Sequence, residues 1–491
     1  MADVVVVGGG IAGIASALVL RRLGHRVVLV ERDASIGGLF RSLVNEAGDA
    51  FDQGTHVLCD TGVEPLDAML HPRRWHKQRR SLDVLRAGNV FRGSVNADSP
   101  FIDLCRLTPG EYRHAVVEAV ERVEPTATPA TLHEQLTALF GPTITGCVIE
   151  PAIQKLYGAR ASELVPNAHR LFGLTRVVAL TPQATRELKN STVLDAKFAF
   201  HSFREGRSPG SNYYPRRGGV ESWIAGLRRE LASRRVEVLV GSAVDSIDHR
   251  RRLVRSVQLT DGRRLACDKL VWTVPSQFCR AAAQLKLDDS HRAAATAATA
   301  ADVPNRARLR TTTLLHVTID RPVATDLHYV TCYDPGISFF RATFYNNLQS
   351  SGPSRAKRHR FTVEVLGDRP ADKDAAHIAA WREMRRLHLV DPNSRVLYRG
   401  AEVIRGGFPV LTHEIVAHRE RELATIRREL RNCFLLGRAN SAAWFHNDVL
   451  REIHDVLTND RAQVTRRQGR RVRHPAHRRR DSGTIPRRKA A

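Results

Sequence analysis

Three glycines close to the N-terminus have the spacing that the phosphates of a dinucleotide require. Gly8, Gly10 and Gly13 separate a β-branched run, residues 4–7, from a segment rich in alanine and leucine, and Glu31 ends the next apolar run. In such a turn the first glycine allows a tight bend, the second lets the backbone approach a pyrophosphate, and the third lets the helix pack closely on the strand. An acid at the end of the second strand accepts hydrogen bonds from ribose hydroxyls. The sequence therefore predicts one βαβ unit that binds an adenine dinucleotide.

A second glycine turn separates FAD from NAD as the expected dinucleotide. Gly37 and Gly38 follow Glu31 after five residues, and Arg41 comes three residues later. A simple NAD dehydrogenase has no need for this turn, whereas the longer FAD brings its pyrophosphate and ribityl chain close to the backbone there. We therefore expect FAD as the cofactor, held non-covalently because no cysteine lies in a context typical of covalent flavin attachment.

The run Gly37-Gly38-Leu39-Phe40-Arg41-Ser42 resembles the GG-x-x-R-[ST] motif of the flavin amine oxidase superfamily. That group includes amine oxidases, protoporphyrinogen oxidase, carotenoid desaturases and, more distantly, UDP-galactopyranose mutase. Residues 51–56 resemble the FD-x-G-x-H strand of the mutase and its relatives, in which the histidine lies near the flavin. The resemblance implies that His56 lies at the reacting face; the alternative is a loop histidine without a catalytic role.

A C-terminal segment is similar to the family's last flavin motif. Gly437 and Arg438 precede Asp448, but the usual second glycine of Gly-Arg-x-Gly is Asn440 here. The resemblance implies that this segment caps the edge of the isoalloxazine, with a helix N-terminus near the pyrimidine ring. A helix dipole there stabilises negative charge on reduced flavin. Residues 213–219, YYPRRGG, resemble the YP-x-GG turn that precedes another helix of the FAD lobe.

Residues 150–158, EPAIQKLYG, resemble the P-x-x-x-K-x-(W/Y)-G stretch of the mutase-like branch. In the mutase an arginine in the following region contacts the substrate diphosphate, and both Arg176 and Arg170 fit that position. The resemblance therefore leaves two candidates for an arginine that binds substrate.

Arg341 stands in an otherwise aromatic strand. Strand alternation places Arg341, Thr343 and Tyr345 on one face of the expected sheet. On that face the guanidinium of Arg341 can pair bidentately with an anionic group. The alternative is an arginine that faces solvent on a half-buried sheet.

The formal net charge of +25 is unevenly distributed over the 491 residues. Residues 461–491 contain twelve Lys and Arg and one acid, which gives +11 and leaves +14 on the remainder. The tail has no hydrophobic period and is predicted to be disordered. It either binds polyanions non-specifically or has no function. The charge on the body favours an anionic substrate or the FAD pyrophosphate, and we expect no specific nucleic-acid partner.

Cysteine spacing and hydropathy argue against a disulfide-rich, metal-binding or membrane-spanning protein. The seven cysteines include no CxxC pair, so neither a disulfide framework nor a metal site is expected. No stretch of 18 uncharged apolar residues predicts a transmembrane helix. The N-terminus lacks the basic segment of a signal peptide, so the expected location is the cytoplasm.

The pattern of elements predicts an α/β fold. It has a Rossmann-type FAD-binding lobe (GR2-like) and a substrate lobe of helices and an antiparallel sheet. The FAD lobe is expected to be discontinuous, formed from residues 1–85, 205–280 and 400–460. Between these lie a mainly helical region, 86–204, and the antiparallel sheet, 281–399; the basic tail, 461–491, follows.

These expectations favour an FAD-dependent oxidoreductase, similar to amine oxidases or protoporphyrinogen oxidase, that takes a hydride from a small organic substrate. The alternative is a non-redox nucleotide-sugar isomerase similar to the mutase, although Trp444 and Phe445 lie where the mutase has a tyrosine pair. A binding protein that retains FAD without a reaction is the third possibility. No triad, dyad or metal cluster of side chains is recognisable, which fits a reaction carried mainly by a cofactor.

Overall fold

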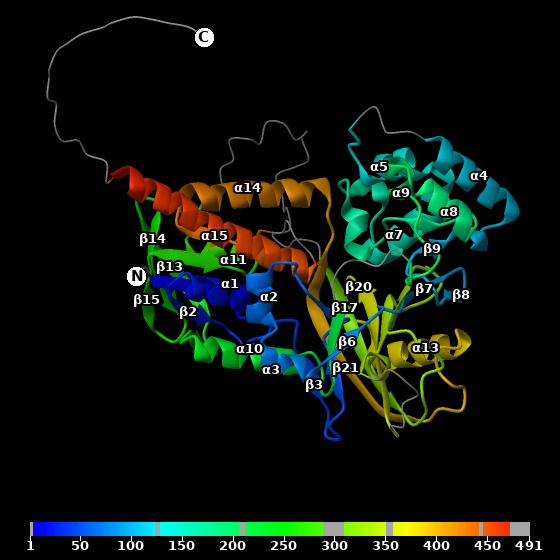
Figure 1. The fold of residues 1–491 in the computed structure, drawn as a ribbon, viewed down its shortest axis with the longest axis horizontal. Helices are drawn as coiled ribbons and strands as arrows, with labels where there is room; N and C mark the ends of the chain where they lie inside the picture. The colour runs from blue at the N-terminus through cyan, green and yellow to red at the C-terminus, as the bar shows by residue number, and fades with distance from the viewer. Residues whose placement is uncertain are drawn as a thin grey trace, which may run out of the picture.

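The computed structural model describes residues 3–122, 128–205, 212–287, 309–349, 357–440 and 445–471, with side chains as far as residue 459. Figure 1 shows three parts side by side: a lobe built on the N-terminal βαβ unit, a helical region, and a large sheet with one helix on its outer side.

The first lobe contains a five-stranded parallel sheet in the order β12-β2-β1-β16-β22. Its strands come from three separate parts of the chain: β1 (Asp3–Val7), β2 (Arg26–Val30), β12 (Glu237–Leu239), β16 (Lys269–Trp272) and β22 (Cys433–Leu435). The β-branched run of β1 is buried on both faces, as expected for a central parallel strand.

Alternate residues of β1 pack into two different cores. Val4 and Val6 face one cluster, to which the following helices contribute: α1 (Ile11–Arg22), α2 (Glu64–Leu70), α10 (Glu221–Ser233) and α15 (His446–Arg471). Val5 and Val7 face another cluster, formed with a three-stranded antiparallel sheet and two helices: β13 (Val244–Arg250), β14 (Leu253–Leu259), β15 (Arg264–Ala266), α11 (Ser276–Ala282) and α14 (His413–Glu429).

Short strands connect this lobe to the rest of the molecule. β3 (Ser42–Val44) pairs with β4 (Ala50–Asp52). A three-stranded sheet has the order β5 (Leu58–Cys59), β11 (Asn212–Pro215) and β6 (Arg79–Leu82). Two short helices complete this part: α3 (Arg73–His76) and α12 (Tyr345–Gln349).

A mainly helical region packs around its own core of buried Leu, Ile, Ala and Phe. It contains α4 (Pro109–Glu121), α5 (Leu132–Phe140), α6 (Pro142–Ile144), a π-helical turn η2 (Thr145–Ile149), α7 (Glu150–Tyr157), α8 (Pro182–Leu188) and α9 (Thr192–Asp195), with a strand pair β9 (Ile102–Asp103) and β10 (Val177–Val178). Thr108 caps α4 through a capping box with Glu111, which explains where this helix begins.

The large sheet has seven strands in the order β21-β17-β20-β19-β18-β7-β8. They are β7 (Ala87–Phe91), β8 (Ser94–Asn96), β17 (Leu309–Ile319), β18 (Tyr329–Cys332), β19 (Arg341–Phe344), β20 (His359–Gly367) and β21 (Val396–Pro409), and all neighbours are antiparallel except β18 and β7. The helix α13 (Lys373–Arg386) covers the apolar face.

Two predicted boundaries differ from this arrangement. The sequence places residues 400–460 in the FAD lobe, whereas β21 pairs with β17 along its whole length and belongs to the large sheet. Similarly, β7 and β8 come from the region predicted to be mainly helical and extend the same sheet. The reason in both cases is strand pairing, since a strand joins the sheet whose edge satisfies its backbone hydrogen bonds.

The chain's last described element is α15, which runs to Arg471, eleven residues into the segment for which the sequence predicts disorder. The remainder of that segment lies outside the described residues. No helix among the described residues is both long enough and apolar enough to cross a membrane. All seven cysteines lie in described segments and are free thiols.

Candidate functional site

The first glycine turn has a geometry that only glycine permits. Gly8 has φ +102°, and a Cβ on Gly13 would lie 1.8 Å from the carbonyl oxygen of Gly8. The N–H of Gly9 donates to Oε2 of Glu31 at 2.6 Å, and the N–H of Asp33 donates to Oε1 at 2.9 Å. Glu31 thus lies against the glycine turn, and each carboxylate oxygen keeps lone pairs for further donors.

The second glycine turn lies directly against the first. The N–H of Gly37 donates to the carbonyl oxygen of Gly9 at 2.8 Å. Gly38 has φ +58°, and a Cβ there would lie 3.1 Å from Cα of Gly10. Arg41 holds the second turn through its Nε, which donates to the Gly38 carbonyl at 2.9 Å. The two turns that the sequence places 29 residues apart therefore form one cradle of backbone.

The cradle leaves room where a ligand would need it. A Cβ on Gly10 would meet no heavy atom closer than Cα of Gly38, at 4.0 Å, and Gly10 does not have a positive φ. No side chain caps α1 at Gly10, so the first-turn N–H groups of that helix are available to an anion. These residues fit the pyrophosphate of FAD.

Asp52 joins two of the sequence motifs. Its buried carboxylate accepts hydrogen bonds from the Ser42 hydroxyl at 2.7 Å, from the Val220 N–H at 2.8 Å and from the Tyr214 hydroxyl. Burial raises the pKa of Asp52. A Cβ on Gly219 would lie 2.2 Å from Oδ1 of Asp52, so the YP-x-GG turn needs glycine there. Asp52 therefore fixes the loop that carries His56 onto the start of α10.

The structure brings the two predicted catalytic residues together around Gly54. A Cβ built on Gly54, which has φ +109°, would lie 3.9 Å from Nε2 of His56 and 3.9 Å from Nη2 of Arg341. The His56 ring packs on the Phe40 ring, with centroids 4.5 Å apart. Burial lowers the pKa of His56 to about 4, so the imidazole is neutral at physiological pH.

Arg341 has a partner that the sequence analysis did not identify. Its Nε and Nη2 donate to Oε1 and Oε2 of Glu364 at 2.7 and 2.9 Å. The two residues are directly opposite in the antiparallel pair of β19 and β20. The Glu364 side chain is 2% exposed and that of Arg341 is 21% exposed. A glutamate inside the apolar run RFTVEVLG was the available signal, because a buried acid requires a partner.

The same face of the large sheet carries further polar side chains. Thr55, from the loop after β4, contacts Thr343 and donates to Oε1 of Glu364 at 3.1 Å. Tyr345 accepts the N–H of Asp52 at 3.0 Å, and Nε2 of His316 lies 3.2 Å from Oε2 of Glu402. The opposite face is apolar and packs on α13. The polar face is therefore the side of the large sheet that meets the segment after β4 of the N-terminal lobe.

The C-terminal motif contacts both the start of α1 and Phe40, the ring on which His56 packs. Gly437 has φ +59°, and a Cβ there would lie 2.7 Å from Cβ of Ala12 at the start of α1. The His446 ring packs edge-on against Phe40, with centroids 5.8 Å apart, and burial lowers its pKa to about 4. Residues 441–444, which include Trp444, lie outside the described segments.

Arg438 and Asp448 of this motif have partners within the protein. Nη2 of Arg438 donates to the Gly407 carbonyl at 2.9 Å. The carboxylate of Asp448, which lies in the first turn of α15, pairs with Arg451. Asp448 stays about half exposed. Asp448 lies in the first turn of α15, whereas Arg438 reaches toward β21.

Two cations from the stretch that resembles the mutase-like branch and from the region after it, Lys155 and Arg176, pair within the protein. Nζ of Lys155 donates to the carbonyls of Asp334 and Phe339 at 2.7 and 2.8 Å, which ties α7 to the large sheet. Arg176 donates to the backbone and side chain of Asp195, at 2.6 and 3.2 Å, within the helical region. Both cations have partners within the protein. Arg170, the other candidate for the arginine that binds substrate, is exposed in the short helical segment Ala168–Phe172.

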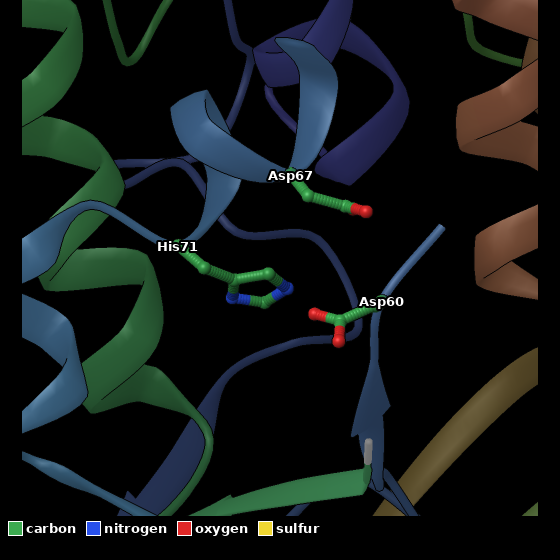
Figure 2. A group of neighbouring side chains, drawn as sticks. All are labelled: Asp60, Asp67 and His71. Carbon is green, nitrogen blue, oxygen red and sulfur yellow. The ribbon is translucent and has the colours of Figure 1, made fainter. Parts of the chain in front are cut away.

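One group of potential metal ligands lies after β5. The ligand atoms of Asp60, Asp67 and His71 are within 4.8 Å of one another, and Figure 2 shows the imidazole pointing between the two acids. Both acids already have donors: the N–H and hydroxyl of Thr61 donate to Asp67 at 2.8 and 2.7 Å, and the Tyr213 hydroxyl donates to Asp60 at 2.7 Å. These hydrogen bonds give the two acids a structural role, which is to fix the conformation of the loop after β5.

Comparisons with known proteins identify a family model and relatives that this chain resembles. Residues 3–99 match the family model described as FAD dependent oxidoreductase. The chain is 28% identical over 229 residues to 6-methylpretetramide 4-monooxygenase of Streptomyces rimosus, covering 42% of this chain and 49% of that protein. It is 43% identical over 68 residues to an uncharacterized protein in the nifH2 3′ region of Methanothermococcus thermolithotrophicus, covering 14% and 65%. The chain thus spans less than two thirds of these curated relatives.

Solved structures share the fold over almost the whole chain. Reduced UDP-galactopyranose mutase superposes with a TM-score of 0.70 at 18% identity, covering 93% of this chain and 96% of that one. A putative protoporphyrinogen oxidase from an Exiguobacterium species gives 0.66 at 14% identity, covering 94% and 99%. The predicted α/β fold and the resemblance to the FAD superfamily are confirmed, and FAD is the cofactor of the matched family.

Proposed function

We propose that this protein is an FAD-dependent oxidoreductase that takes a hydride from a small organic substrate to non-covalently held FAD. The observation that carries the proposal is the contact between the two glycine turns. Gly10 and Gly38 approach each other through Cα atoms alone, and the space beside Gly10 is open. A dinucleotide longer than NAD is the ligand that needs backbone from both turns.

Each part of the cradle has a role in this proposal. The N–H groups at the start of α1 bind the pyrophosphate, and Glu31 accepts the ribose hydroxyls. Gly37, Gly38 and Arg41 hold the second turn beside them. Gly437 lies against the start of α1, Arg438 ties the same segment to β21, and Asp448 lies in the first turn of α15, whose dipole favours negative charge. Bound FAD supplies the hydride acceptor.

His56 and Arg341 are the proposed residues of the reacting face. The neutral imidazole of His56, fixed against Phe40, orients a substrate and exchanges a hydrogen bond with it without adding charge. Arg341 positions the same face through its pair with Glu364. The apolar ring of Phe40 helps to exclude water from this region.

The alternative is an isomerase of nucleotide sugars similar to the mutase. Its support is the resemblance of residues 51–56 and 150–158 to the mutase-like branch, together with the net positive charge of the body. The pairing of Lys155, Arg176 and Arg341 within the protein counts against it, because a nucleotide diphosphate needs cations that are free to bind it.

A pair of glycine variants tests the cofactor site. Gly10→Ala places its methyl group in open space, so we expect a folded protein that melts at the temperature of the FAD-free wild type and binds little FAD. Gly110→Ala, at a helical position where a Cβ also meets no atom within 4 Å, is the matched control and should keep FAD. Normal FAD content in Gly10→Ala would contradict the proposed site.

A substrate screen tests the reaction. The FAD-loaded wild type is mixed anaerobically with amines, porphyrinogens, polyenes and nucleotide sugars while the flavin spectrum is recorded. Bleaching by one of the first three without dithionite is the expected result. Turnover of a nucleotide sugar only after reduction by dithionite would instead establish the alternative.

A further inference from the structure

The arginine and the glutamate at the proposed reacting face, Arg341 and Glu364, neutralise each other within the protein. Arg341 gives two of its donors to Glu364, and the acid accepts a further bond from Thr55. His56 is neutral because it is buried. Glu402, on the same face of the sheet, is hydrogen-bonded to His316.

An ionic ligand would have to break this pair. A phosphate that binds Arg341 must displace Glu364, which is 2% exposed and would be left as a buried carboxylate without its cation. An ammonium that binds Glu364 would likewise leave the guanidinium without an anion. Both outcomes are unfavourable, because isolated buried charges are strongly destabilised.

We propose that Glu364 determines specificity by neutralising Arg341, so that the face around Gly54 accepts substrates that are uncharged there and rejects phosphates and ammonium groups. This inference rests on the proposed function and narrows its substrate class. It favours oxidation of a neutral C–C or C–N bond over oxidation of a cationic amine or rearrangement of a nucleotide sugar.

The test measures binding of inorganic pyrophosphate to the FAD-loaded full-length chain by titration calorimetry, at a salt concentration that weakens contacts with the basic tail. We expect Glu364→Gln, which frees the Arg341 guanidinium, to bind pyrophosphate about tenfold more tightly than the wild type. The double variant Arg341→Gln/Glu364→Gln should return to the wild-type affinity.

Glu422→Gln is the matched control. Glu422 pairs with Arg280 at 2.8 Å with side chains 5% and 20% exposed, close to the values at Glu364 and Arg341, but the pair joins α14 to α11. This variant should bind pyrophosphate as the wild type does. A gain in both glutamine variants would show a general charge effect and overturn the assignment.

The Arg341→Gln variant tests the same inference if Glu364→Gln does not fold. In the wild-type background, Arg341→Gln should leave pyrophosphate binding unchanged and increase binding of 1,4-diaminobutane, because Glu364 is then unpaired. Loss of wild-type pyrophosphate binding in Arg341→Gln would show that the arginine was already available, and the inference would fail. FAD content is recorded for every variant, so failure of the cofactor proposal is recognised separately.

Discussion

The two faces that meet at the proposed site are built by different means. In the dinucleotide lobe the recognition surface is backbone: Gly10 and Gly38 contribute N–H groups and close contacts but no side chain. On the large sheet it is side chain: Arg341 and Glu364 pair across two strands with little exposed surface. The first surface depends on glycines: Gly8 and Gly13 are required by the fold of the turn itself, whereas Gly10 leaves open the space that a ligand would fill. The second is specified by charge balance.

The comparison predicts that a side chain added to the glycine turn has the largest effect of any single change. In Gly13→Val the Cβ would lie 1.8 Å from the Gly8 carbonyl oxygen, so α1 and β1 cannot keep their packing. We expect a loss of stability above the roughly 3 kcal/mol typical of overpacking. Circular dichroism during heating and the FAD content of the purified protein measure it. A variant that melts like the wild type would refute this account of the turn.

Sequence alone was sufficient for the backbone surface. The spacing of Gly8, Gly10 and Gly13 and the pair Gly37–Gly38 each impose a local geometry, so the motif predicts the structure without knowledge of the rest of the chain. The contact between the two turns follows because both adjoin the ends of parallel strands β1 and β2.

The side-chain surface was predicted only in part. Alternation identified the face that carries Arg341, and resemblance identified His56, but Glu364 lies 23 residues from Arg341 and meets it only in the register of β19 and β20. Register depends on which strands pair, which local sequence does not specify. The same limit explains why β21 was assigned to the FAD lobe.

The second prediction tests the side-chain surface. Arg341→Met leaves Glu364 buried without its cation and should lower the free energy of unfolding by about 3 kcal/mol. The double variant Arg341→Met/Glu364→Leu removes both charges and should recover most of that loss, since well-packed apolar pairs replace buried ion pairs at little cost. Urea unfolding provides the measurement.

A control in the other lobe makes the comparison sharper. Arg280→Met breaks a pair of similar burial and should cost a similar free energy of unfolding. Only the Arg341 variants should also alter the flavin spectrum in the presence of substrate. If Arg341→Met stays within about 1 kcal/mol of the wild type, the pair does not hold the sheet face as argued.

The smallest predicted effect concerns acid and a buried histidine beside the large sheet, since the backbone of the glycine turns has no group that titrates there. His328, next to β18, is 1% exposed; its Nδ1 accepts the Arg86 N–H at 3.1 Å, and its Nε2 has no partner among the described residues. Burial lowers its pKa to about 3 from an ordinary value of 6.5. Between these two pH values the unfolded chain binds a proton that the folded chain does not, so stability falls as the pH drops below 6.5. At pH 4.5 the loss of unfolding free energy is about 2–3 kcal/mol.

The variant His328→Asn keeps an acceptor for Arg86 and cannot titrate. The difference in unfolding free energy between pH 7 and pH 4.5 should therefore shrink by that amount. The same substitution at the exposed His114 leaves a solvated side chain in both states and should not change the difference; an equal shift in both variants would mean that burial in the sheet is not the cause.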